Sequence, residues 1–117
     1  ITNLKNNTEF CNTFCPKLIQ LTNELLDKIE KFDFQEGKYK INKEVFKLYW
    51  CLETIYEFRD KINFEELKQI ILRAKNIQEY TIREKTAKIL TDNYTDSDLL
   101  KAKEELKNDS NYYVRRF

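Results

Sequence analysis

The cysteine and histidine content decides most of what this chain could catalyse. The sequence has three cysteines, Cys11, Cys15 and Cys51, and no histidine. Without histidine, Ser-His-Asp and Cys-His nucleophile pairs and all His-containing metal sites are excluded. Cys11 and Cys15 are four residues apart and share one helix face, but three thiols would hold zinc only with a carboxylate or a water as fourth ligand.

We interpret the three cysteines as small, buried hydrophobic residues that pack together in the core. The alternative is a disulfide, either between Cys11 and Cys15 or between more distant partners. The odd number of cysteines indicates a reducing compartment, so we expect the protein to be cytoplasmic.

The remaining residue types offer no other catalytic group. A single glycine, Gly37, leaves no glycine-rich phosphate loop and no dinucleotide fingerprint. The acidic pairs, such as Glu65 and Glu66, lie at expected helix starts or on polar faces, where they favour the helix dipole and solubility. We therefore expect no catalytic residue, no cofactor and no metal, and predict that the protein is not an enzyme.

Basic side chains give a second candidate site, although the net charge is only +1. If the second helix of each helix pair lines one concave surface, six of them form a stripe that could contact phosphates: Lys43, Lys47, Arg83, Lys88, Arg115 and Arg116. The alternative is that these residues reflect the high lysine content of the whole chain.

Tyrosines near expected turns give a third candidate site. Tyr80, Tyr112 and Tyr113 are placed where an aromatic ring can anchor a partner protein. They could equally close the core with their rings and keep their hydroxyl groups in water.

The elements that position these residues are predicted to be helices. Apolar residues recur every three or four positions, which is typical of one helix face, and no strand-like alternation of useful length occurs. In the first helix this stripe is Phe14, Leu18, Leu21, Leu25, Ile29 and Phe32. We expect helices over 13–32, 41–62, 64–75, from about 79, over 97–107 and from 112, and hence an all-α fold of antiparallel helices.

Breakers and caps set the boundaries of these helices. Pro16 fits the first turn of the first helix, and Gly37 marks the first connection. Asn63 and Thr95 are expected N-caps, each followed three residues later by an acid. Aromatic residues widen the apolar face of the second helix, so we expect it to be central and covered on two sides, and Phe64 should point inward from the third.

Two segments of the second half repeat with an offset of 32 residues. Ile82-Arg83, followed by Thr86-Ala87 and Leu90, opens one helix, and Val114-Arg115 opens the next after a turn that contains Asp109. This pattern resembles the HEAT-repeat family of helical solenoids. The resemblance implies a short α-α superhelix of five to six helices in one domain, with 1–62 as atypical capping helices and 63–117 as repeats that are cut off at the end of the chain. It also implies that Arg115 pairs with Asp109.

The function that this resemblance implies is binding. We expect a non-enzymatic module that binds a partner protein; the alternative is a module that binds the nucleic-acid backbone, similar to helical-repeat proteins of the DNA alkylation repair type. No segment of the sequence is apolar enough to insert into a membrane. Self-association through the C-terminal end, near Val114 and Phe117, is a further expectation.

Overall fold

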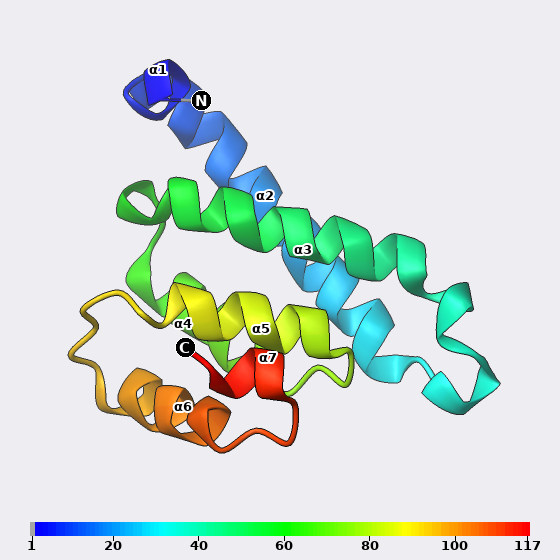
Figure 1. Ribbon diagram of the computed structural model, residues 1–117. Helices are drawn as coiled ribbons and strands as arrows, with labels where there is room; N and C mark the ends of the chain where they lie inside the picture. The colour runs from blue at the N-terminus through cyan, green and yellow to red at the C-terminus, as the bar shows by residue number, and fades with distance from the viewer. Residues whose placement is uncertain (1) are drawn as a thin grey trace.

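The computed structural model describes residues 2–117, and every regular element in that range is helical (Figure 1). The all-α prediction is confirmed. The α-helices are α1 (Thr2–Lys5), α2 (Thr8–Lys31), α3 (Asn42–Glu57), α4 (Phe64–Ala74), α5 (Tyr80–Ile89), α6 (Ser97–Lys107) and α7 (Tyr112–Arg115), and three short 3-10 turns lie at Phe34–Glu36, Lys38–Lys40 and Arg59–Lys61. Two of the seven, α1 and α7, have only four residues each.

Helix α2 is the longest element and begins earlier than predicted. The Asn7 side chain accepts a hydrogen bond from the Phe10 N–H and fixes the start at Thr8. We had expected Pro16 in the first turn because it has no N–H to donate. It lies inside the helix instead. Local capping by Asn7 adds a turn and a half that the hydrophobic stripe does not reveal.

The buried face of α2 differs from the predicted stripe most clearly at Leu21. Leu21 is 45% exposed, whereas the neighbouring Thr22 is fully buried. The Thr22 hydroxyl donates to the Leu18 carbonyl at 2.7 Å, so its burial leaves no unpaired polar group. Leu18, Thr22, Leu25 and Ile29 thus form the seam at alternating spacings of four and three, which is the spacing of helices that pack lengthwise.

Helix α3 returns along α2 after a turn at Gly37 and packs on α5 with its other side. Gly37 has φ +108°, a backbone conformation that residues with a Cβ rarely adopt, so glycine is favoured at this turn. The prediction that this helix is central and covered on two sides is confirmed. The expectation that aromatic residues widen its apolar face is wrong for Trp50, which is exposed, as is the neighbouring Phe46.

The second half consists of short helices α4 to α7 with polar caps. The Asn63 side chain accepts from the Glu66 N–H as predicted, but α6 is capped by Asp96 and not by Thr95. Phe64 is 44% exposed and borders a surface hollow with Leu67 and Tyr94, so it does not point into the core as expected. The predicted core residues of the later helices are all buried: Ile82, Thr86, Ile89, Leu90, Leu99, Ala102 and Leu106.

One cluster of buried residues runs from Leu18 in α2 to Val114 in α7 and joins the two halves. Arg73 on α4 ties them further at the surface through ion pairs with Asp27 and Glu30 on α2, each at 2.7 Å. Within residues 2–117 no helix combines the length and the apolar character that crossing a bilayer requires.

Candidate functional site

The repeat residues that the sequence singled out come together where α5, α6 and α7 meet. Arg83 on α5 holds the Asp109 carboxylate with two hydrogen bonds, Nε to Oδ2 at 2.8 Å and Nη2 to Oδ1 at 3.2 Å. The resemblance implied that Arg115 forms this pair. The structure corrects that: Asp109 lies in the turn before α7, and its carboxylate faces back to the preceding helix pair.

Arg115 instead repeats a different part of the Arg83 environment. Arg83 Nη1 donates to the carbonyls of Ile77 and Gln78, and Arg115 Nη1 donates to those of Asp109 and Ser110, which are six and five residues before the arginine in both cases. Each arginine thus donates hydrogen bonds to backbone carbonyls of the turn that precedes its own helix. Ile82 and Val114, which precede the two arginines, are both buried.

Opposing effects set the protonation of the Asp109 carboxyl. Burial raises its pKa, but the hydrogen bonds from Arg83 and from the Asn111 N–H outweigh burial and hold the pKa below its ordinary value. The carboxylate is therefore charged at neutral pH, and the Arg83–Asp109 pair connects α5 to the turn before α7.

The six predicted phosphate contacts do not all present free charges. The donors of Arg83 are engaged by Asp109 and two carbonyls, and Arg116 pairs with Glu84 at 2.8 Å. Lys43 and Lys47 are exposed on α3, whereas Lys88 is exposed on α5 and Arg115 and Arg116 on α7 or directly after it. The exposed members thus divide between α3 and the α5–α7 end.

The three predicted tyrosines are close neighbours. The ring centroids of Tyr80 and Tyr113 are 6.2 Å apart, and those of Tyr112 and Tyr113 are 5.7 Å apart. Tyr112 is 62% and Tyr113 53% exposed, so these two rings stand at the surface beside the arginines of α7.

A groove between α3 and the start of α5 was not found by sequence reasoning. It encloses about 520 Å³, and Val45, Phe46 and Tyr49 of α3 form its apolar wall. Glu79 and Glu84 lie on the opposite side. Phe46 is 65% exposed and meets Trp50, 51% exposed, edge to face with ring centroids 6.2 Å apart. The aromatic edge of this groove therefore faces solvent.

Lys85 on α5 is a second feature that sequence reasoning missed. Its side chain is 5% exposed, forms an ion pair with Glu53 on α3 and lies over the Tyr49 ring, 4.8 Å from the centroid. Burial, and then the nearby Lys88 charge, lower the pKa of the Lys85 amine. Lys85 lies beside the stripe formed by residues 82, 86 and 89, and from the sequence a lysine there is expected to be solvated. Only the contact of α5 with α3 buries it.

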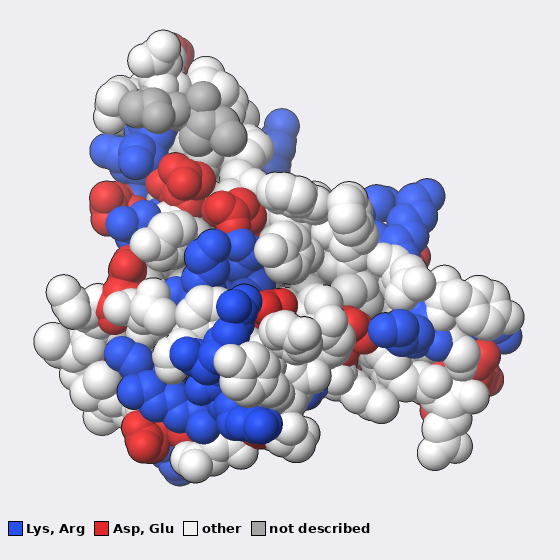
Figure 2. Space-filling view, viewed as in Figure 1, with Lys and Arg blue, Asp and Glu red and all other residues white. Residues whose placement is uncertain are grey.

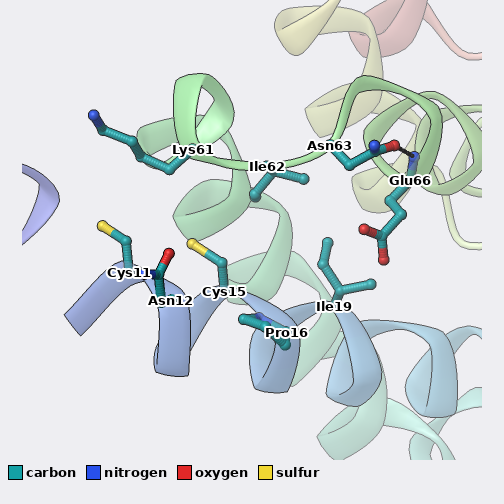
Figure 3. A pocket seen from close by; sticks show the side chains of 9 residues that line it. All are labelled: Cys11, Asn12, Cys15, Pro16, Ile19, Lys61, Ile62, Asn63 and Glu66. Atoms are coloured by element: carbon teal, nitrogen blue, oxygen red, sulfur yellow. Dashed lines mark hydrogen bonds between the residues drawn. The ribbon is translucent and has the colours of Figure 1, made fainter. Parts of the chain in front are cut away.

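Cys11 and Cys15 line a different cavity of about 230 Å³ at the junction of α2 with the turn before α4 (Figure 3). Cys11 and Cys15 pack with Phe58, whereas Cys51 belongs to the main core, so the expectation that the three thiols meet is wrong. Burial, and then the neighbouring Cys11, raise the pKa of the Cys15 thiol. Burial likewise raises that of Cys51, so both stay protonated and are poor nucleophiles.

No cluster of potential ligands for a metal ion occurs in the part of the chain that the structure describes. Comparison with protein-family models, with curated proteins and with solved structures found no match to this chain. The class that the structure defines is thus an all-α protein with an aromatic groove on α3 and a basic, tyrosine-bearing end at α7.

Proposed function

We propose that the protein is a non-enzymatic helical-repeat module of the HEAT-like kind that binds a partner protein through the α3–α5 groove. The observation that carries the proposal is the exposure of Phe46 and Trp50 at the edge of this groove. Large aromatic side chains are the residues that most often supply binding energy at protein interfaces. Their position on a central helix holds them on a rigid support.

The shape of the groove supports a protein segment as the ligand. An apolar wall of Val45, Phe46 and Tyr49 opposite Glu79 and Glu84 offers burial for apolar side chains and acceptors for polar ones. Glu79 is paired with Lys38 and Glu84 with Arg116, so the acidic side is already ordered before a partner arrives.

The helical-repeat assignment is supported by the matching environments of Arg83 and Arg115 at an offset of 32 residues. In such arrays each helix pair stacks on its neighbour and exposes a continuous surface for binding. Self-association through the chain end is a separate part of the proposal. Because Val114 is buried, it would depend on Tyr112 and Tyr113. A reducing compartment such as the cytoplasm fits three buried, unbridged thiols.

The test is affinity capture with chemical cross-linking from extracts of the source cell. We expect specific protein partners to cross-link to the wild type and to be lost from a Phe46→Ala/Trp50→Ala double variant. Because both residues are exposed, their loss should leave the circular-dichroism melting curve nearly unchanged.

Leu100→Ala is the matched control, since Leu100 is also a large exposed hydrophobic residue but lies on α6. It should keep every partner. Retention of the same partners by the double variant, or equal loss from the control, would contradict the proposal.

A further inference from the structure

Lysine and arginine side chains gather over α5, α6 and α7, away from the groove wall on α3 (Figure 2). We call Lys88, Lys103, Lys107 and Arg116 the basic face. Lys103 and Lys107 border the same small hollow as Ala87 of α5, Val114 of α7 and the Phe117 ring. Lys88 follows Ala87 along α5, and the Arg116 guanidinium lies 4.8 Å from the centroid of the Phe117 ring. Lys103, Lys107 and Arg116 therefore converge on one surface, and Lys88 extends it along α5, where it borders a second hollow with Glu53 and Tyr56 of α3.

Most of the charge on the basic face is not neutralised within the protein. Among the described residues, Lys88, Lys103 and Lys107 form no ion pair, whereas Lys68 on α4 and Lys75 at its C-cap are each held by acids of α6 or its cap. Arg116 is paired with Glu84 but remains 45% exposed. Three free ammonium groups beside a half-exposed guanidinium favour a polyanionic ligand.

Aromatic rings accompany this charge at α7. The Arg115 guanidinium lies 5.7 Å from the centroid of the Tyr112 ring, and that of Arg116 lies 5.8 Å from that of Tyr113. Both tyrosines are more than half exposed, so part of each ring is open to solvent next to a cation. An acidic peptide would use the cations alone, whereas a nucleic acid uses the cations for phosphates and the rings for bases.

We propose that the basic face and the Tyr112–Tyr113 pair together bind single-stranded nucleic acid. Lys88, Lys103, Lys107 and Arg116 contact the phosphates, and the two tyrosines stack on unpaired bases. A duplex keeps its bases stacked inside and leaves the tyrosines without a partner, so the single strand is the preferred form. This function goes beyond protein binding in the α3–α5 groove and does not depend on it.

The test is fluorescence anisotropy with a labelled single strand of mixed sequence, about 15 nucleotides long, and with the matching duplex. Titrations at about 50 mM and about 200 mM salt give the salt dependence of the affinity. We expect the wild type to bind the single strand more tightly than the duplex and to lose affinity steeply with salt.

The charge variant is Lys88→Gln/Lys103→Gln/Lys107→Gln. We expect the affinity for the single strand to fall at least tenfold, and the salt slope to decrease by about 2, because three phosphate contacts are removed. The matched control is Lys17→Gln/Lys43→Gln/Lys47→Gln, which removes the same charge from exposed lysines of α2 and α3. The control should keep the wild-type affinity.

The stacking variant is Tyr112→Ala/Tyr113→Ala. We expect about a tenfold loss of affinity for the single strand with an unchanged salt slope, since no charge is removed. All variants alter exposed or half-exposed side chains, and circular dichroism verifies that each is folded.

Four results would overturn the proposal. They are the absence of single-strand binding at low salt, equal or tighter binding of the duplex, an equal loss in the α2–α3 control, and tighter binding of a polyglutamate peptide than of the single strand. The last would identify an acidic protein as the ligand of the basic face.

Discussion

The helices of the first half, α2 and α3, and those of the second half, α4 to α7, are stabilised by different kinds of contact. Helices α2 and α3 have 24 and 16 residues and pack lengthwise along an apolar seam whose only buried polar side chain, Thr22, satisfies itself within its helix. Helices α4 to α7 have 11 residues or fewer and are joined by charged side chains that reach from one helix to the next. Short helices are marginal alone, so their stability depends on such tertiary contacts.

This difference also separates the two candidate surfaces. The α2–α3 half covers its seam and leaves aromatic side chains exposed on the outer side of α3. The α4–α7 half uses several of its charges internally and leaves others free on the basic face. A surface for a protein segment and a surface for a polyanion thus follow from the way each half is stabilised.

The largest expected effect is on the buried face of α2 that contains the seam. Leu26 is fully buried, so Leu26→Ala should lower the free energy of unfolding by about 3 kcal/mol through lost burial and a residual cavity. Chemical denaturation measures it. The control Leu21→Ala, five residues earlier on the exposed side, should cost less than about 1 kcal/mol. Similar losses for both variants would show that the seam is not where the structure places it.

The next effect tests the polar connection in the second half. Arg83→Ala removes the partner of the part-buried Asp109 carboxylate and the donor to two carbonyls, so we expect a loss of about 2 kcal/mol in the same measurement. Arg115→Ala removes hydrogen bonds to exposed turn carbonyls and a contact with the exposed Tyr112 ring, and should cost less than about 1 kcal/mol. If Arg115 proved the more costly of the two, the pairing of Asp109 with Arg83 would be wrong.

The smallest effect is the pH dependence of this connection. The pKa of Asp109 is lower in the folded protein than the value of about 3.9 expected when unfolded. A carboxyl with a depressed folded pKa stabilises the fold above the unfolded pKa, and this stabilisation is lost as the pH falls through the folded pKa. Urea unfolding of the wild type and of Asp109→Asn should therefore differ at neutral pH and converge in acid below about pH 4. A gap that stayed constant with pH would contradict the assignment.

The helices and most of their bounds could be predicted from the sequence because the signals are local. The spacing of Leu67, Ile70, Ile71 and Ala74, the Asn63 cap and the single glycine at the first turn each act over a few residues. The start of α2 was missed because a cap at Asn7 carries no periodic signal.

Which residue of a stripe faces a neighbour was decided by the tertiary structure. Leu21 and Thr22 differ by one position on the same helix, and only the path of α3 along α2 buries the threonine. Phe46 and Trp50 are residue types that usually lie in a core. They stay exposed because the two covered sides of α3 already pack against α2 and α5.

The helical character of the chain, the positions of most of its turns, and the lack of histidine chemistry and glycine-rich phosphate loops follow from the amino-acid sequence alone. The ion pairs, in contrast, depend on the packing of the helices. Asp109 pairs with Arg83 and Glu53 with Lys85, whereas among the described residues Lys88, Lys103 and Lys107 have no partner. The two differ because the interactions act over different separations along the sequence. Helix formation depends on residues three or four apart, whereas these pairings join residues 26 and 32 positions apart, whose approach is set by the packing of whole helices.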